Sequence, residues 1–240
     1  MPDKEFAMEK MRQTLDAGLP SLGLELTEHQ KQTLCQFGAA VVKQNEVMNL
    51  TAITESEAVA KLHLLDSLTV LATADLRGKR LIDVGCGAGF PGVPTAIACP
   101  EAKITLLDSL GKRVKWLESI LPQLGISAEC VTARAEEAVA DRRESYDYAT
   151  SRAVARLNIL LELTAPYVKV GGAVLAMKGA LAKEELTEAQ SAIKKLGLKL
   201  EEVKEYPIDG TNHAVIVLRK VTPTPKTYPR RYAKIKQAPL

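Results

Sequence analysis

A short apolar run that ends in a cluster of glycines constrains the fold of this chain more than any other feature. Residues 81–92 read LIDVGCGAGFPG. The apolar residues predict a buried strand, and the glycines permit a tight turn at which a ligand can approach the backbone closely. The stretch therefore predicts a strand, a ligand-binding loop and the start of a helix, in that order.

Runs of β-forming residues continue after this loop and alternate with helical stretches. We expect seven strands, over residues 80–84, 103–107, 128–132, 146–150, 173–177, 199–206 and 213–219. This alternation is typical of βαβ units in a mostly parallel sheet. Residues 207–212, between the last two runs, are rich in turn-forming residues and too few for a crossover helix, so these strands should form an antiparallel hairpin.

Residues before Arg80 read as helical. Thr27-x-x-Gln30 and Thr54-x-x-Glu57 are capping-box patterns, and apolar residues near helical spacing follow each of them. We therefore expect an N-terminal helical subdomain over residues 1–78, an α/β domain over 79–220 and a C-terminal tail over 221–240.

The C-terminal tail gives the chain its basic character. The formal net charge is +3, yet from residue 219 onward there are seven bases and no acid: Arg219, Lys220, Lys226, Arg230, Arg231, Lys234 and Lys236. A basic terminus interrupted by prolines is typical of contact with RNA phosphates. The alternative is a tail that only keeps the protein soluble.

Several classes of protein are disfavoured by composition. The four cysteines are scattered without the spacing of metal ligands or of a disulfide framework, so we expect no metal site. The chain has no apolar run long enough to span a membrane, and its first residues do not resemble a secretion signal. We expect a cytoplasmic protein, acting as a monomer.

The spacing Gly85-x-Gly87-x-Gly89, preceded by Asp83, resembles the first motif of S-adenosylmethionine-dependent methyltransferases. A dinucleotide cofactor is the alternative, because residues 87–92 also satisfy Gly-x-Gly-x-x-Gly. Counted from the first glycine after the strand, however, the third fingerprint position is Phe90, which favours the methyltransferase. A terminal strand inserted antiparallel is also typical of the methyltransferase version of the Rossmann-like fold.

Two later strand ends supply further candidates for cofactor binding. Asp108 follows the glycine loop by about twenty residues, at the position where an acid can accept hydrogen bonds from ribose hydroxyls. Ser109 could cap the next helix and so leave Asp108 free. Ala135 and Glu136 lie where methyltransferases of this fold contact adenine, although an acidic residue there also suits the first turn of a helix.

The residues after the fourth strand bear on the type of reaction. Residues 150–156 read TSRAVAR, without the Asp/Asn-Pro-Pro-aromatic motif of enzymes that methylate exocyclic amines, and no Pro-Cys nucleophile of cytosine-C5 enzymes is present. An acceptor that is already nucleophilic, such as guanine N7, is favoured instead. Arg152 and Lys178, at predicted strand ends, could orient guanine or hold phosphates, and structural ion pairing is the alternative.

Taken together, these motifs resemble the bacterial ribosomal RNA small-subunit methyltransferase G family, also called glucose-inhibited division protein B. The resembling stretches are residues 49–53 (NLTAI), 63–68 (HLLDSL), 83–92, 107–113 (LDSLGKR), 134–136 (RAE), 151–155 (SRAVA) and 177–179 (MKG). The resemblance implies methylation of guanine 527 at N7 in 16S RNA, on the free RNA or on the 30S subunit.

The resemblance also implies roles for individual residues. Gly85, Phe90, Ala135, Glu136 and Arg152 match cofactor-contacting positions, and Lys112, Arg134 and Lys178 match cations at the active site or on RNA. Arg152 is thus a candidate for contact with the cofactor and with guanine.

Three points are left open by the sequence. The Gly and inner Pro that end the family's tail are missing after Pro229-Arg230, which leaves the conformation of this tail undetermined. His63 and Asp66 resemble a catalytic pair, but a structural role is favoured. A methyltransferase acting on a small molecule or protein, and a non-enzymatic RNA-binding assembly factor, are the alternative functions.

Overall fold

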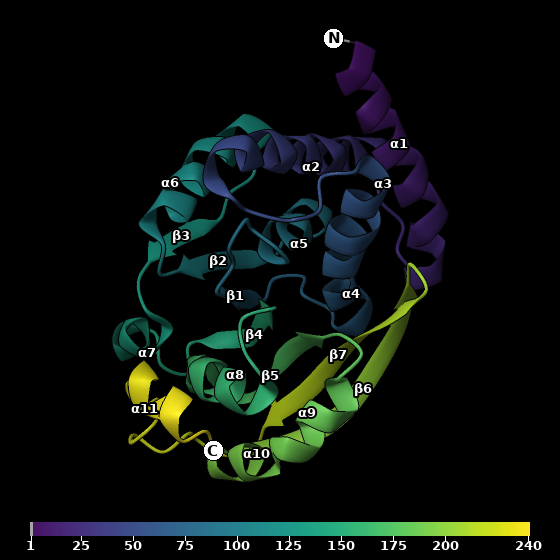
Figure 1. Ribbon diagram of the computed structural model, residues 1–240. Helices are drawn as coiled ribbons and strands as arrows, with labels where there is room; N and C mark the ends of the chain where they lie inside the picture. Colours follow the sequence, from purple (N-terminus) through teal and green to yellow (C-terminus); the bar gives the residue numbers. More distant parts are fainter. Residues whose placement is uncertain (1) are drawn as a thin grey trace.

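A seven-stranded sheet forms the centre of the molecule, and the computed structural model describes residues 2–240 (Figure 1). The strand order is β3-β2-β1-β4-β5-β7-β6, and β7 runs antiparallel to both of its neighbours. The strands are β1 (Arg80–Val84), β2 (Lys103–Asp108), β3 (Glu129–Thr132), β4 (Tyr146–Arg152), β5 (Val168–Lys178), β6 (Leu198–Ile208) and β7 (Thr211–Lys220). The predicted Rossmann-like methyltransferase topology, with its antiparallel last strand, is confirmed.

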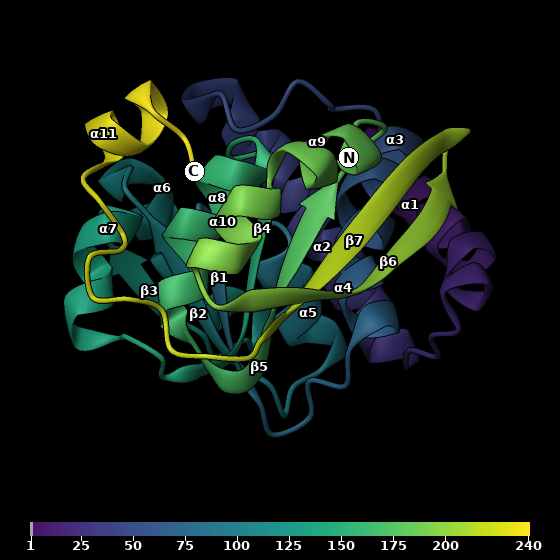
Figure 2. The same cartoon turned by 90° about the horizontal axis from the view of Figure 1, so that it is seen from below.

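Helices cover both faces of the sheet (Figures 1 and 2). The helices packed on one face are α1 (Pro2–Gly18), α2 (Glu28–Met48), α3 (Ser56–Val59), α4 (Asp66–Thr73), α5 (Gly92–Ala98) and α6 (Gly111–Ile120). Those associated with the other face are α7 (Ala135–Ala138), α8 (Leu157–Thr164), α9 (Ala182–Glu188), α10 (Gln190–Lys195) and the terminal α11 (Tyr232–Gln237). None of the helices within residues 2–240 is long and apolar enough to cross a membrane.

The N-terminal helices share one hydrophobic core with the sheet. Leu15 of α1 and Phe37 of α2 belong to the same buried cluster as Leu81 of β1 and Leu106 of β2. The next residue of β1, Ile82, points to the opposite face and packs with α8 and α10, as the alternation of side chains along a strand requires. The N-terminal helices are therefore packed on the face of the sheet that β1 and β2 present.

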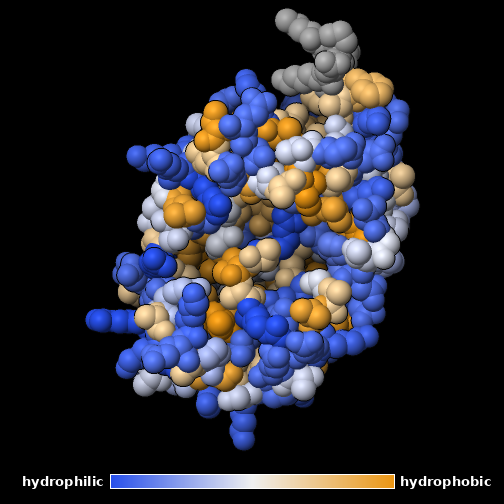
Figure 3. Space-filling model, viewed as in Figure 1, coloured by the Kyte–Doolittle hydropathy of each residue, from blue (hydrophilic) through white to orange (hydrophobic). Residues whose placement is uncertain are grey.

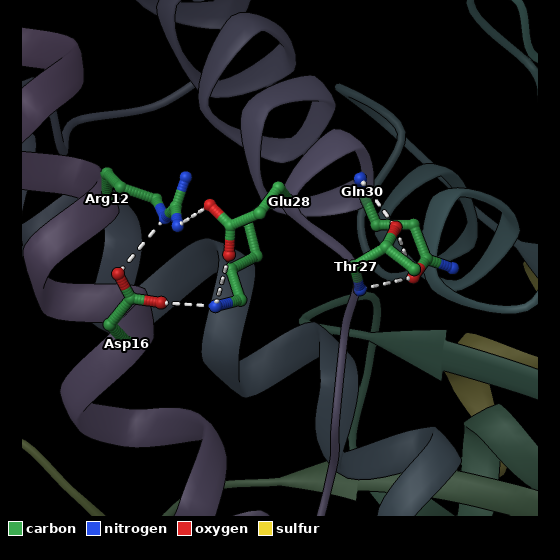
Figure 4. A network of polar contacts seen from close by, with 6 residues as sticks. Arg12, Asp16, Thr27, Glu28 and Gln30 are labelled. Carbon is green, nitrogen blue, oxygen red and sulfur yellow. Dashed lines mark hydrogen bonds and ion pairs between the residues drawn. The ribbon is translucent and has the colours of Figure 1, made fainter.

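The first predicted capping box is present and the second is not. Thr27 and Gln30 exchange side-chain hydrogen bonds with each other's backbone N–H groups at the start of α2 (Figure 4). At the second site Glu55, not Thr54, caps α3, and its carboxylate accepts from the backbone N–H of Ala58. A carboxylate at this position also interacts favourably with the helix dipole.

Ion pairs join α1 to the start of α2. Arg12 pairs with Asp16 and Glu28, and Lys31 pairs with the same two acids at 2.7 and 3.1 Å, which closes a four-residue ring (Figure 4). The two acids are exposed and the two bases are half-buried, so we expect the ring to orient α1 more than it stabilises the fold.

Two strand boundaries differ from the sequence prediction because of backbone features. The fifth strand begins at Val168, five residues before the predicted start, because Gly171 and Gly172 are part of the strand. A side chain at Gly172 would place its Cβ 2.3 Å from the Asp147 carbonyl oxygen, beside the irregular pairing of β4 and β5. The predicted hairpin is confirmed, but its turn is only Asp209-Gly210, both with positive φ, as in a type I′ turn.

Residues 221–240 pack on the protein as an ordered strap. Lys220, although charged, is buried and donates to the Ala165 carbonyl oxygen at 2.8 Å, and its Nζ lies 3.3 Å from Glu144. Farther along, Ile235 of α11 is fully buried. Both cartoon views place α11 beside α7 and α8 (Figures 1 and 2).

Candidate functional site

The glycine loop after β1 brings backbone, free of side chains, to the end of the sheet. Gly85, Gly87 and Gly89 have φ values of 75°, 55° and 96°, which residues with a Cβ adopt at a cost. A Cβ on Gly85 would lie 2.5 Å from a methyl group of Val154. The loop therefore leaves no room for a side chain at Gly85, while its backbone lines a cavity.

This cavity has a volume of about 490 Å³ and lies at the carboxyl ends of β1, β2 and β4, the usual ligand position in an open α/β sheet. The space-filling view shows the same face hollowed near its centre, with hydrophobic side chains around the hollow (Figure 3). The candidate residues that line the cavity are Gly85, Gly87, Phe90, Asp108, Arg134, Ala135, Glu136 and Arg152. The sequence candidates Asp83, Gly89, Lys112 and Lys178 do not line it.

Asp83 and Gly89 support the loop from behind. Asp83 is fully buried; one carboxylate oxygen accepts from the Gly92 N–H at 2.8 Å, and the other has no partner within the described residues. Burial raises the pKa of Asp83 to about 7. A Cβ on Gly89 would lie 2.7–3.1 Å from Val93, Leu117 and Phe37. Both residues are thus placed to shape the loop.

Asp108 is held by backbone donors. One oxygen accepts from the Gly87 N–H at 2.9 Å, and the other accepts from the Leu110 N–H at 2.8 Å. Asp108 therefore links the glycine loop to the end of β2 and caps the following turn, a task that the sequence reading gave to Ser109. An ionised carboxylate offers about four acceptor positions, so these two bonds leave capacity for ribose hydroxyls.

Arg152, at the end of β4, joins the N-terminal helices to the site. Its Nη1 donates to the Leu62 carbonyl oxygen and to Asp66 Oδ2, both at 2.8 Å, and its Nη2 lies 3.2 Å from His63 Nδ1. The guanidinium carbon also lies 5.1 Å from the ring centre of Phe90, within cation–π range. Arg152 is thus oriented by three groups from the segment Leu62–Asp66 and by the glycine loop.

His63 and Asp66 do not bond to each other within this network. His63 stacks on Phe90 with ring centres 4.7 Å apart, and its Nε2 lies 2.7 Å from Thr51 Oγ1. Asp66 Oδ1 lies 2.8 Å from His213 Nδ1 on β7. His63 belongs to a π-helical segment, Ala60–Leu65, of the kind that often occurs at functional sites.

Electrostatic effects shift the pKa values of His63 and His213 in opposite directions. Burial, together with the charge of Arg152, lowers the pKa of His63 to about 4. The hydrogen bond to Asp66 raises the pKa of His213. Burial alone would raise the pKa of Asp66, but hydrogen bonds and charge from His213 and Arg152 outweigh it, and the net shift is downward. At neutral pH His63 is therefore uncharged and Asp66 is ionised.

A second cavity, of about 600 Å³, lies on the other side of Arg152. It shares His63, Arg152, Ala153 and Val154 with the first cavity. Its remaining walls are Ile53, Leu62, Asp66, Ala155, Arg156, Met177, Lys178, Gly179, Glu185 and His213. The two cavities thus meet at the end of β4.

Among the candidate cations, Lys178 is paired and Lys112 and Arg134 are exposed. Lys178 Nζ is buried and donates to the Ala155 carbonyl oxygen at 2.6 Å and to Glu185 at 2.7 Å. Burial lowers the pKa of Lys178. Lys112 lies on the exposed side of α6, and Arg134 lies 6.0 Å from the ring centre of Tyr232. Lys178 therefore holds the loop after β4 in place.

Several residues that line the first cavity were not sequence candidates, among them Leu50, Thr51, His63, Arg113 and Tyr232. The stretch 49–53 and His63 had been noticed as motifs, but their packing against the glycine loop depends on how α2 and α4 fold back on the sheet. Arg113 is the residue after Lys112 in the LDSLGKR motif. Because it lies one position farther along α6, its side chain reaches the neighbourhood of Gly87. Nothing in the sequence indicated Tyr232.

Titration of the histidines tests the opposite pKa shifts of His63 and His213. In NMR spectra of the three histidines, the His63 resonance should show no protonation down to about pH 5, and the His213 midpoint should lie above its ordinary 6.5. The stability gained by keeping His63 neutral should be complete above pH 6.5 and be lost as the pH falls toward 4. Asp66→Asn should lower the His213 midpoint, with His29 as the internal reference; an unchanged midpoint would contradict the pairing.

Comparisons with known proteins agree with this geometry. A family model described as "GidB: rRNA small subunit methyltransferase G" matches residues 30–213. The chain is 43% identical to a ribosomal RNA small subunit methyltransferase G of Alkaliphilus metalliredigens, over 94% of this chain and 97% of the relative. For that of Lactobacillus johnsonii the identity is 44%, over 92% and 96%.

Solved structures share the fold at low identity. TYW2 of M. jannaschii in complex with AdoMet has a TM-score of 0.54 at 14% identity, over 66% of this chain and 76% of that chain. The YcgJ protein of Bacillus subtilis has a TM-score of 0.52 at 13% identity, over 65% and 99%. The family match and the glycine-loop cavity lead to one conclusion: this chain belongs to the rRNA small subunit methyltransferase G (GidB) family of S-adenosylmethionine-dependent methyltransferases.

Proposed function

We propose that this chain transfers the methyl group of S-adenosylmethionine to N7 of a guanine in 16S ribosomal RNA, namely guanine 527. The observation that carries this proposal is the meeting of two cavities at Arg152. One is lined by the glycine loop, and we assign the other to the acceptor base. The two relatives, both named ribosomal RNA small subunit methyltransferase G, match more than nine-tenths of this chain. We further propose that the enzyme acts as a cytoplasmic monomer.

The residues present fit the cofactor. The bare backbone at Gly85 and Gly87 suits the methionine part, Asp108 suits the ribose hydroxyls, and Ala135 with Glu136 suits adenine. The cavity volume lies within the usual range for small-molecule sites. When bound, S-adenosylmethionine supplies a methyl group activated by a positively charged sulfur.

The chemistry required of the second cavity is modest. Guanine N7 carries a lone pair at neutral pH, so the site needs no strong base and acts by holding the base in place and excluding water. This agrees with the side chains there: Lys178 is paired with Glu185, His213 with Asp66, and His63 is neutral. We propose that Lys178 is a positioning residue that fixes the loop Ala153–Arg156.

Arg152 has the central position in this proposal. Arg152 contacts the stacked rings of His63, which lines both cavities, and Phe90, which lines the first, and its bond to Asp66 fixes its orientation. We propose that Arg152, which lines both cavities, contacts the cofactor on one side and the guanine on the other.

Exposed cations of α6, of the residue before α7 and of the tail fit an RNA partner. Lys112 and Arg134 lie on α6 and before α7, and the tail adds exposed Lys226, Arg231, Lys234 and Lys236. By contrast, Arg219, Lys220 and Arg230 are engaged with Glu201, Glu144 and Glu162. We propose that the exposed group contacts rRNA phosphates, because clustered unpaired cations are the usual phosphate-binding surface.

Methyl transfer tests the proposed reaction. The enzyme should transfer labelled methyl from S-adenosylmethionine to 16S RNA, or to 30S subunits, from a strain that lacks this activity. After nuclease digestion the label should be in N7-methylguanosine, and subunits already methylated in a wild-type strain should accept none. Label in another nucleoside, or no transfer to either substrate by protein that binds the cofactor, would overturn the assignment.

Gly85 offers a sharp test of the cofactor loop. Gly85→Ala should weaken S-adenosylmethionine binding about tenfold or more, as measured by calorimetry, because its Cβ would displace Val154. Gly78→Ala is the matched control: Gly78 has a similar φ of 69° but nothing within 4 Å of the added Cβ. Both variants should lose about 1–2 kcal/mol of stability. Equal cofactor affinities for the two variants would contradict the placement of the loop.

A further inference from the structure

The C-terminal strap reaches the cofactor cavity at one residue. Tyr232, the first residue of α11, lines that cavity together with Ala133, Arg134, Ala135 and Glu136. The guanidinium of Arg134 lies 6.0 Å from the Tyr232 ring centre, so the two side chains face each other across this end of the cavity. An aromatic ring from the last twenty residues thus stands at the end that the proposed function gives to adenine.

A buried ion pair fixes the strap in this position. Glu162 is completely buried in α8, between apolar residues, and both of its oxygens accept from the Arg230 guanidinium, at 2.8 and 2.6 Å. Glu162 also accepts from the Arg230 backbone N–H at 2.8 Å. A buried carboxylate without a partner is strongly unfavourable, so the sequence of α8 requires Arg230 to dock there.

Other contacts continue this anchoring on both sides of Arg230. Before it, Thr224 donates from its N–H to Glu144 at 2.8 Å and from its hydroxyl to the Leu196 carbonyl oxygen at 2.9 Å. After it, Ile235 is fully buried. Tyr232 lies between these anchored residues, which hold it at the cavity beside Arg134.

We propose that the C-terminal strap is a wall of the cofactor site and that Tyr232 covers the adenine end. This inference depends on the proposed function for the identity of the ligand. The flat phenol ring suits stacking on adenine, and Arg134 closes the site beside it. Cofactor binding is thereby coupled to the docking of residues 228–240. This coupling does not depend on any contact between the exposed lysines of the strap and RNA.

Binding measurements without RNA test this proposal independently of the methyl acceptor. Tyr232→Ala should weaken binding of S-adenosylhomocysteine and of methylthioadenosine, which lacks the amino-acid part, by the same factor of about ten, the size expected for loss of one stacked ring. Tyr232→Phe should retain both affinities. Gln237→Ala, at an exposed position on the same helix, is the control and should bind like the wild type. Unchanged affinities for Tyr232→Ala would overturn the proposal.

A second experiment detects the strap itself. Trypsin cleaves after the exposed basic residues of α11, and saturating S-adenosylhomocysteine should slow this cleavage, because a ligand that binds the docked strap favours docking. Glu162→Gln should speed the cleavage and weaken ligand binding together. Cleavage at the same rate with and without ligand, in folded wild-type protein that binds it, would contradict the proposal.

Discussion

The ion pair between Arg152 and Asp66 is the interaction on which the rest of the site depends. It joins the end of β4 to the start of α4, and both side chains are mostly shielded from solvent. Breaking a buried pair by removing one partner costs about 3–5 kcal/mol, because the remaining charge is left without compensation. The pair therefore binds the N-terminal helices to the sheet at the place where the two cavities meet.

Through His63 and His213, this pair is connected to Thr51, to Phe90 and to β7. His63 contacts Thr51 and stacks on Phe90, and Leu50 and Thr51 line the first cavity. His213 connects the pair to β7, the strand whose antiparallel insertion marks this version of the fold. The N-terminal helices thus contribute residues to the proposed active site, and they share one hydrophobic core with the sheet.

The sequence predicted well the features that depend on local patterns. The seven strands, the hairpin and the loop at Gly85 follow from periodicity, turn residues and the need for positive φ, all of which are local. The predicted start of β5 was wrong: glycines are generally unfavourable within a strand, whereas Gly171 and Gly172 belong to this one and Gly172 approaches Asp147 closely. The cap at Glu55 was missed because the capping-box pattern favours a hydroxyl one residue earlier.

The features that sequence could not supply depend on tertiary contacts. The burial of Lys178 follows from Glu185 on α9, and the docking of the strap follows from Glu162 on α8. Tyr232 lines the cavity only because of that docking. The strand end predicted Asp108 as a cofactor residue, but its bonds to the Gly87 and Leu110 N–H groups depend on the folded loop.

A double-mutant cycle on methyl transfer tests the central role of the Arg152–Asp66 pair most directly. The kcat/KM for the RNA acceptor would be measured for Arg152→Ala, Asp66→Asn and the double variant, with folding checked by circular dichroism. If the two residues act as one unit, the double variant should be no worse than Arg152→Ala alone. Losses that multiply would show that Arg152 and Asp66 act separately and would contradict the account.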